Sequence, residues 1–527
     1  MAGVMIAAPK SGSGKTMITC GLLKLLDRKG WNPAPFKCGP DYIDGLFHNK
    51  VLGLESGNLD SFFEEPDHMR EKISHISADR FVVAEGVMGY FDGLGGISAK
   101  GSTWEISQIL ELPVILVVDA KGASLSLAAQ VKGFLEYVPR DEEGKEIKCV
   151  NRIGGILFNR ISPMIYGRVK ALIEEQLHVP VIGYVPELDF LQVGSRHLGL
   201  VLPDEIDGLK GQMERLADCM EKTVDLDVLS MISGGKGEAD ELNPGREHRA
   251  RPGKADSGRE HRAQQGNPDS DRNQYPNPGK ADSDEMNCRQ MWCGKSGTAP
   301  FAHGCEKNSD RQFYLGVALD EAFCFYYRDN LTALEQAGAR LVYFSPLRDE
   351  TIPDYLDGLL FGGGYPENYA GELAGGISMR SSVADAAGRG MPILGECGGY
   401  LYLLETLQGI NGKDYPMAGV LPGRGFRGDK KGRFGYIILS PDGTLPYILP
   451  GMEIKGHEFH YWDCECGDEE YRMTARKPVG GRSWRCMRTR GDVLAGFPHL
   501  YYPSCPGFAE RFADRCIIFG RKMGHES

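Results

Sequence analysis

Short apolar runs alternate with longer amphipathic stretches through the first part of the chain. The apolar runs predict strands at residues 4–8, 81–85, 114–119 and 153–158. Stretches in which apolar residues recur every three or four positions predict helices at residues 15–28 and 103–110. Because runs such as VILVV are apolar at successive positions, we expect both faces of these strands to be buried, which favours a parallel sheet covered by helices.

The same alternation begins again later in the chain. Strands are predicted at residues 313–318, 340–344, 359–361 and 392–394, and a helix at residues 331–337. The predicted fold class is therefore α/β, with two doubly wound domains.

A polar segment separates the two patterned regions. Between Gly234 and Pro300 the only residue among Val, Ile, Leu and Phe is Leu242, so the segment cannot bury enough apolar surface to offset its ordering entropy. GREHRA and PGKADS each occur twice in it, with offsets that match no known solenoid repeat. We predict a disordered, flexible linker at residues 233–311 that joins domains at residues 1–232 and 312–520.

Composition and charge narrow the functional classes. The chain has 527 residues, of which 41% are hydrophobic and 25% charged, which suits a protein with sizeable cores. Its 60 basic and 72 acidic residues give a net charge of −12, which opposes binding to nucleic acid or to an anionic membrane. No apolar run reaches the ~18 residues of a membrane-spanning helix, and residues 1–8 read as a strand rather than a signal peptide. We expect a cytoplasmic protein that acts on small molecules.

A glycine-rich turn follows the first predicted strand. Residues 8–16 read APKSGSGKT and lead into an amphipathic helix, which is the context of a phosphate-binding loop. Lys15 is expected to reach the β- and γ-phosphate oxygens, and Thr16 to hold Mg²⁺ at the positive end of a helix dipole. Pro9 replaces the first glycine of the usual pattern, so the match is to a deviant form. The residues predicted to bind ATP here are Lys10, Gly12, Ser13, Gly14, Lys15 and Thr16.

Acidic residues follow two predicted strands near this loop. They lie in KCGPDYIDG, at residues 37–45, and in FVVAEGVMGYFDG, at residues 81–93. Carboxylates at the carboxyl ends of parallel strands face the crevice in which open α/β sheets bind ligands. Each acid alone reads as a turn or cap residue, but together they favour a ligand site. We predict metal ligands at Thr16, Asp41 and Glu85, and substrate contacts at Tyr42, Asp44 and Asp92.

A second candidate site centres on Cys397. The sequence ILGECGGYL joins a strand, a turn of small residues and a helix, which is the arrangement that exposes a nucleophile at the tip of a sheet. Gly398 is expected to stabilise an oxyanion together with Gly363 and Gly364 of LFGGGYPE. The alternative is a buried structural thiol, and the glycines on both sides favour the nucleophile.

A cysteine nucleophile needs a base, and spacing alone does not identify it. The C-terminal histidines are His457, His460, His499 and His525. A lone histidine is more often a hydrogen-bonded structural residue than a base. The residues alone therefore leave the choice open.

Taken together, the motifs resemble the cobyrinate a,c-diamide synthase family. In chain order they are KCGPDYID, EGVMGYFDG, RHLGL, ALDEAFCFYY, FSPLRDE, FGGGYPE, GECGGYLYL and GHEFHY. They fall in both patterned regions and skip the polar segment. The resemblance implies an N-terminal, P-loop ATP-binding domain related to dethiobiotin synthetase and a C-terminal class I type glutamine amidotransferase domain.

The resemblance also implies roles for single residues. Carried over by position, Cys397 is the glutaminase nucleophile and His499 raises its nucleophilicity. Class I triads commonly carry a glutamate two residues after the histidine, whereas this chain has Tyr501, so a Cys–His pair is expected. Asn159 resembles a position that contacts adenine in the related fold and is added to the ATP-binding residues. A contribution from His457 or His460 is left open.

The implied activity is a ligase reaction in cobalamin biosynthesis. ATP activates the a and c side-chain carboxylates of cobyrinate as acyl phosphates, and ammonia from glutamine converts them to amides. The expected partners are cobyrinate, glutamine, ATP and Mg²⁺, and a homodimer is left open. One alternative is the same reaction on Ni-sirohydrochlorin or hydrogenobyrinate. Another, of a different class, is a P-loop ATPase switch whose amidotransferase-like module is not catalytic.

Overall fold

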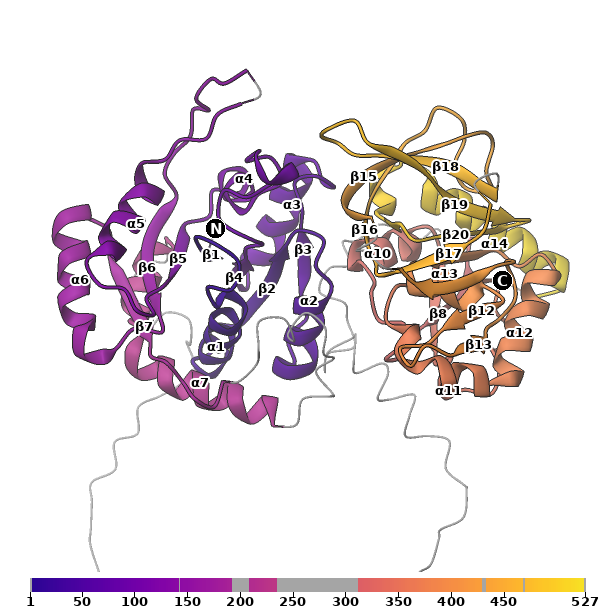
Figure 1. Cartoon of the computed structure of the whole chain (residues 1–527), viewed down its shortest axis with the longest axis horizontal. Helices are drawn as coiled ribbons and strands as arrows, with labels where there is room; N and C mark the ends of the chain where they lie inside the picture. The colour runs from indigo at the N-terminus through magenta and orange to yellow at the C-terminus, as the bar shows by residue number, and fades with distance from the viewer. Residues whose placement is uncertain are drawn as a thin grey trace, which may run out of the picture.

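The chain folds into two α/β halves. The computed structural model describes residues 2–141, 143–191, 208–234, 311–428, 433–467 and 470–525. The N-terminal half, drawn from indigo to magenta, lies beside the C-terminal half, drawn from orange to yellow (Figure 1). Most of the predicted linker at residues 233–311, and the motif RHLGL, fall outside the described residues. The linker and the domain boundaries therefore stay predictions.

The N-terminal half is built on a seven-stranded sheet in the order β3-β2-β4-β1-β5-β6-β7. All its neighbouring strands pair in parallel, as the continuous apolar runs predicted. The strands are β1 (Gly3–Ala7), β2 (Pro33–Cys38), β3 (Gly57–Leu59), β4 (Phe81–Glu85), β5 (Val114–Asp119), β6 (Ile153–Asn159) and β7 (Val181–Val185). The helices are α1 (Lys15–Arg28), α2 (Ile43–Phe47), α3 (Pro66–Ser77), α4 (Thr103–Leu110), α5 (Ser126–Glu136), α6 (Pro163–Leu177), α7 (Leu209–Thr223) and α8 (Leu226–Ile232), with short turns η1 (His48–Leu52) and η2 (Leu94–Gly96).

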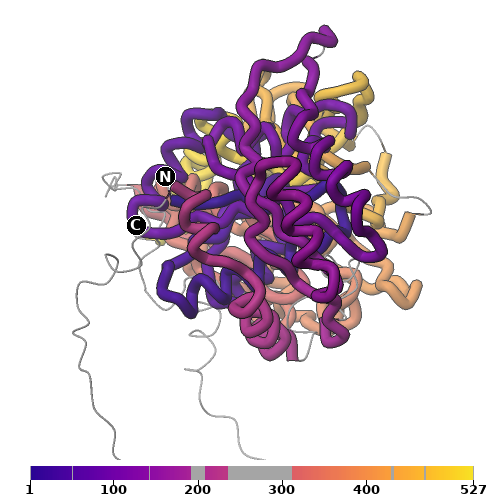
Figure 2. The backbone as a smooth tube through the Cα atoms, turned by 90° about the vertical axis from the view of Figure 1, so that its left-hand side faces the viewer, coloured from indigo at the N-terminus to yellow at the C-terminus, as the bar shows by residue number. Residues whose placement is uncertain are grey.

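Helices cover both faces of this sheet. Met5 of β1 belongs to the core under α3, α4, α5 and α6, while its neighbour Ile6 belongs to the core under α1 and α7. Successive side chains of a strand point to opposite faces, so a strand between two cores must be apolar at every position. Figure 2 looks onto this half, with the C-terminal half behind it.

The C-terminal half is built on a ten-stranded mixed sheet in the order β21-β16-β15-β18-β19-β20-β11-β10-β8-β9. Its parallel part holds β8 (Phe313–Ala318), β9 (Ala339–Phe344), β10 (Gly358–Phe361), β11 (Ile393–Glu396) and β20 (Val493–Gly496). Its antiparallel part holds β15 (Phe434–Pro441), β16 (Ile454–Phe459), β18 (Tyr471–Arg476), β19 (Ser483–Arg490) and β21 (His499–Leu500). A second sheet holds β12 (Thr406–Gln408), β13 (Asp414–Pro416), β14 (Arg424–Arg427) and β17 (Trp462–Glu465). The helices are α10 (Arg328–Gln336), α11 (Ala370–Gly375), α12 (Ile377–Gly388), α13 (Gly398–Leu403) and α14 (Phe508–Met523), with η4 (Pro366–Tyr369) and η6 (Tyr502–Ser504).

The end of the ten-stranded sheet curls back toward its parallel part. β20 pairs with β11, whereas β21, which follows after two residues, pairs with β16 at the sheet's edge. The antiparallel strands must therefore bend around to meet the chain again at this corner. The corner brings His499, the first residue of β21, back to the loops at the tips of the parallel strands.

An aromatic junction joins the two halves. It consists of Tyr42 and Phe63 from the N-terminal half and Phe325, Tyr327, Tyr436 and Tyr501 from the C-terminal half. Polar contacts flank it: Tyr436 donates to Asp60 at 2.8 Å, and Lys72 pairs with Asp329 at 2.9 Å. Within the described ranges, the helices are too short or too polar to cross a bilayer.

Candidate active sites

A phosphate-binding loop connects β1 to α1. Gly12 and Gly14 adopt φ values of 77° and 91°, in the left-handed region that glycine tolerates. Gly14 is also closed in, because a Cβ there would lie 2.3 Å from Nδ2 of Asn159. That amide nitrogen, at the end of β6, donates to the Ser13 carbonyl at 2.9 Å. This hydrogen bond holds the loop in front of the N-terminus of α1, where free backbone N–H groups favour an anion.

Lys15 lies beside this loop in a poorly solvated position. Its ammonium donates to the Met88 carbonyl at 2.5 Å. Burial, with help from the positive charge of Lys37, lowers the pKa of Lys15 to about 8. The negative charge of a phosphate bound here would favour the protonated form of Lys15. Lys10, by contrast, has an exposed side chain, and its carbonyl accepts a hydrogen bond from the Ser13 hydroxyl.

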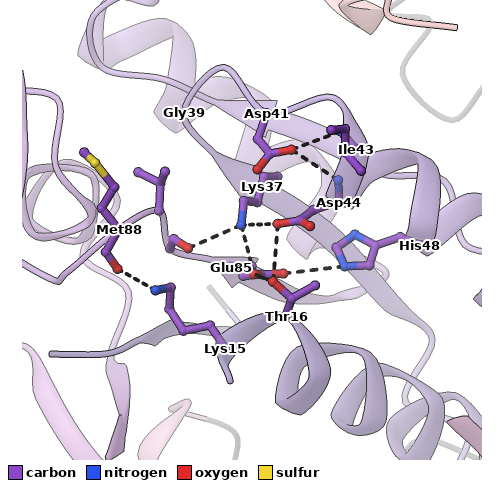
Figure 3. A network of polar contacts seen from close by, with 12 residues as sticks. Lys15, Thr16, Lys37, Gly39, Asp41, Ile43, Asp44, His48, Glu85 and Met88 are labelled. Atoms are coloured by element: carbon purple, nitrogen blue, oxygen red, sulfur yellow. Dashed lines mark hydrogen bonds and ion pairs between the residues drawn. The ribbon is translucent and has the colours of Figure 1, made fainter. Parts of the chain in front are cut away.

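A buried polar network lies next to Lys15 (Figure 3). The Thr16 hydroxyl lies 2.6 Å from Glu85 Oε1 and 3.4 Å from Asp44 Oδ2. The Lys37 ammonium pairs with both carboxylates, at 2.9 Å from Glu85. Burial raises the pKa of Glu85 to about 7. Burial would also raise the pKa of Asp44, but Lys37 and Thr16 outweigh it and hold that pKa below its usual value.

The oxygen atoms of this network suit a magnesium ion. Glu85 Oε2 is buried and has no hydrogen-bond partner among the residues the structure describes. Hydroxyl and carboxylate oxygens are the ligands that Mg²⁺ prefers, and it commonly takes its other ligands from phosphate and water. Metal binding by Thr16 and Glu85 stays a prediction, with their oxygen atoms 2.6 Å apart.

Asp41, Asp92 and Tyr42, the other predicted ligand residues, make contacts of their own. The Asp41 carboxylate accepts the backbone N–H groups of Ile43 and Asp44 at 3.0 and 3.2 Å, as a helix cap does. Asp92 is exposed and accepts the N–H of Gly89 at 2.9 Å. The Tyr42 ring lies in the junction with the C-terminal half. Metal binding by Asp41, and substrate binding by Tyr42, Asp44 and Asp92, remain predictions.

Cys397 occupies a strained turn between β11 and α13. Its φ of 51° is in the left-handed region, which a residue other than glycine rarely adopts, and such strain is typical of nucleophile turns. The glycine-rich loop after β10 lies directly against this turn. A Cβ at Gly398 would lie 3.0 Å from the backbone nitrogen of Gly364. The N–H of Gly398 itself faces the Cys397 sulfur. The backbone nitrogens of Gly364 and Gly398 thus lie close to the Cys397 turn, and their role as oxyanion donors stays a prediction.

His499 lies against the same glycine-rich loop. A Cβ at Gly363 would lie 2.2 Å from Cε1 of His499. His457 stacks on His499 with ring centroids 4.9 Å apart, and its Nδ1 lies 3.1 Å from the Tyr327 hydroxyl. His460 instead stacks on Phe497 at 4.0 Å.

The fourth C-terminal histidine, His525, lies apart from this cluster. It follows the last helix, α14, and pairs with Asp357 at 2.8 Å. The structure therefore brings Cys397, His499 and the three predicted oxyanion glycines together and leaves His525 out.

Burial sets the protonation of the cysteine and the histidine. The side chains of Cys397 and His499 are 8% and 2% exposed. Burial, with the nearby charge of Glu367, raises the pKa of the Cys397 thiol well above its usual value. Burial also lowers the pKa of His499, and His457 and His460 lower it further. At neutral pH the pair is therefore a thiol and a neutral imidazole, so proton transfer must accompany attack on a substrate.

Sequence reasoning missed Lys37, which is 4% exposed and balances both carboxylates next to the loop. The available signal was a lysine inside the otherwise apolar strand PAPFKC. It also missed that Tyr501 turns away from His499, with its hydroxyl donating to Asp329 at 2.9 Å. The Tyr501–Asp329 contact joins residues that are far apart in the sequence, so no local pattern could have indicated it.

Comparisons with known proteins match both halves. Residues 4–200 match a family model described as the CobQ/CobB/MinD/ParA nucleotide binding domain, and residues 315–504 match the CobB/CobQ-like glutamine amidotransferase domain. The chain is 34% identical to the cobyrinate a,c-diamide synthase of Listeria innocua serovar 6a, over 95% of this chain and 97% of that protein. It is 35% identical to the hydrogenobyrinate a,c-diamide synthase of Brucella abortus biovar 1, over 95% of this chain and 98% of that protein.

Proposed function

The chain belongs to the cobyrinate and hydrogenobyrinate a,c-diamide synthase family, and from that premise we propose that it amidates the a and c carboxylates of cobyrinate, using glutamine and ATP. One observation carries the proposal: a phosphate-binding loop and a strained cysteine turn with its histidine lie in halves that touch through the aromatic junction. A synthetase that uses ammonia from its own glutaminase domain needs both sites in one molecule. The same reaction on hydrogenobyrinate or Ni-sirohydrochlorin is the alternative.

The C-terminal half releases ammonia. Cys397 Sγ attacks the side-chain carbonyl carbon of glutamine, while His499 takes the thiol proton and passes it to the departing ammonia. The N–H groups of Gly364 and Gly398 stabilise the oxyanion of the tetrahedral intermediate, and Gly363 leaves room for the imidazole. Water then hydrolyses the thioester, which releases glutamate and restores the thiol.

The N-terminal half activates the carboxylate. A substrate carboxylate oxygen attacks the γ-phosphorus of ATP and ADP leaves, which gives an acyl phosphate. Ammonia attacks the acyl carbon and phosphate leaves with the C–O bond electrons. Lys15 and the N-terminus of α1 bind the phosphates, and Asn159 donates to the loop; its contact with adenine is proposed from the family resemblance. A magnesium ion held by Thr16 and Glu85 would neutralise charge on the transferring phosphoryl group.

A non-catalytic switch is the competing function of a different class. A module that only binds glutamine would not need a strained cysteine with φ of 51° in a turn next to the glycine loop that holds a buried histidine. The net charge of −12 likewise supports small-molecule partners in the cytoplasm over nucleic acid or an anionic membrane.

Parallel assays with cobyrinate, hydrogenobyrinate and Ni-sirohydrochlorin test the proposal. Each tetrapyrrole is supplied with Mg²⁺, ATP and glutamine, and amide products are identified by mass spectrometry. We expect diamide from cobyrinate. ATP and glutamine hydrolysis without any amide product would support the switch, and diamide from another tetrapyrrole alone would reassign the substrate.

A further inference from the structure

Among the described residues, no acid is hydrogen-bonded to His499 to fix its orientation. Its Nδ1 atom is buried and has no hydrogen-bond partner in the part of the chain that the structure describes. Tyr501, at the position where class I triads commonly carry a glutamate, directs its hydroxyl to Asp329. A general base must nevertheless keep its ring aimed at the thiol, because small displacements of catalytic groups reduce rates strongly. Packing must therefore hold the imidazole.

Three groups pack against the His499 ring. Gly363 lies against Cε1, so close that no side chain fits between them. The His457 ring stacks at 4.9 Å with an interplanar angle of 20°. The Tyr42 ring lies 5.2 Å away with an interplanar angle of 42°. The first two belong to the C-terminal half, whereas Tyr42 comes from the N-terminal half.

Tyr42 is itself fixed firmly within the junction. Its ring stacks on Phe325 at 5.4 Å with an interplanar angle of 8°, and its centroid lies 4.6 Å from that of Tyr327. It also lies 5.6 Å from His457, whose Nδ1 is hydrogen-bonded to Tyr327. Tyr42 thus contacts the catalytic histidine, the histidine stacked on it and the tyrosine that anchors the second histidine.

The neighbours of Tyr42 in the sequence connect it to the polar network beside the phosphate-binding loop. On one side Asp41 caps the N–H groups of Ile43 and Asp44. On the other side Asp44 pairs with Lys37 and approaches the Thr16 hydroxyl. Residues 41–44 therefore reach from the phosphate-binding loop to the imidazole of the other half.

We propose that Tyr42 is a positioning residue of the glutaminase, so that the cysteine–histidine site of the C-terminal half is completed by a ring from the N-terminal half. The inference rests on the proposed function in one respect, namely that Cys397 and His499 hydrolyse glutamine. The Tyr42 ring contacts His499 directly, whereas its hydroxyl is hydrogen-bonded to Tyr327; we assign the positioning to the ring. Docking of the two halves and glutamine hydrolysis are thereby linked.

Glutamine hydrolysis measured without nucleotide or tetrapyrrole tests the proposal. For Tyr42→Ala and Tyr42→Leu we expect kcat to fall about 10- to 100-fold, with the KM for glutamine changed less than about 2-fold, since the histidine is misplaced while the glutamine pocket persists. Tyr42→Phe keeps the ring and should retain kcat within about 2-fold. Phe62→Ala is the matched control, because Phe62 packs on Tyr436 in the same region without contacting His499. It should also stay within about 2-fold of the wild type.

Three outcomes would overturn the inference. If the wild type depends on Cys397 but Tyr42→Ala and Tyr42→Leu hydrolyse glutamine at the wild-type kcat, Tyr42 does not position His499. If Phe62→Ala loses as much kcat as Tyr42→Ala, the loss comes from weakened docking of the two halves and not from the Tyr42 ring. If the wild type and Cys397→Ala hydrolyse glutamine equally, the proposed glutaminase fails and the inference falls with it. Thermal unfolding of each variant excludes a folding defect, and the leucine variant retains apolar volume if the alanine variant does not fold.

Discussion

Gly363 and His499 are packed so closely that a Cβ on the glycine would lie 2.2 Å from Cε1 of the imidazole. Gly363→Ala must therefore push the imidazole or the loop out of place. We expect glutamine hydrolysis to fall about 100-fold, because a shift of the base of about 1 Å has that effect. Amidation with ammonium as the nitrogen donor should be unchanged.

Gly388→Ala is the control for this substitution. Gly388 ends α12 and has open space where a Cβ would lie. It should hydrolyse glutamine at the wild-type rate. If Gly363→Ala does the same, the loop does not constrain the histidine.

Glu85→Gln tests the metal and phosphate site. The substitution keeps the shape of the side chain but removes a charge that faces Thr16 and Lys37. We expect ammonium-dependent, ATP-dependent amidation to fall about 10- to 100-fold, as is usual when a group that supports a metal site is lost. Glutamine hydrolysis should persist. The control Glu187→Gln removes an exposed acid of the same half, and equal rates for the two variants would contradict the role of Glu85.

The glutaminase should tolerate acid. His499 acts as a base only when neutral, and burial lowers its pKa below the usual 6.5. Because its folded pKa is depressed, the neutral form persists at pH values where an ordinary histidine is protonated, and activity is lost only as the pH falls further. The pH profile of kcat/KM for glutamine hydrolysis should therefore have its acid limb below pH 6.5. An acid limb at or above that value would contradict a lowered pKa of His499.

The ion pairs around Lys72 should stabilise the docked halves. Lys72 bridges Glu64 at 2.7 Å and Asp329 at 2.9 Å, and its side chain is only 11% exposed. Lys72→Met leaves two carboxylates without their cation, which should lower the free energy of unfolding by about 3 kcal/mol. Chemical denaturation measures the change. The control Lys132→Met removes an exposed ion pair within α5 and should unfold like the wild type; an equal loss would contradict the assignment.

Local patterns were enough to predict much of the fold. The expected bounds of α1, β4, β5 and β8 agree with the structure, because a strand buried on both faces or a regular amphipathic helix is visible in a short window. The antiparallel strands escaped notice. Along β18, buried Tyr471, Met473 and Ala475 alternate with more exposed neighbours, which is a weaker signal than an apolar run.

The sequence predicted more of the phosphate site than of the site around Cys397 and His499. The phosphate loop and the Cys397 turn are each contained in a few consecutive residues, so the sequence alone was enough to predict them. The contacts of His499 depend on the corner that brings β21 to β16, which no spacing along the chain reveals. The placement of Tyr42 depends on docking of the two halves, and its motif indicated only the phosphate side.

The central claim is that Cys397 supplies the ammonia that the N-terminal half uses. Product formation is measured for the wild type and Cys397→Ser with cobyrinate, Mg²⁺ and ATP, once with glutamine and once with ammonium as donor. We predict that Cys397→Ser forms no diamide from glutamine but matches the wild type with ammonium. Diamide formation from glutamine by Cys397→Ser at the wild-type rate would contradict the account.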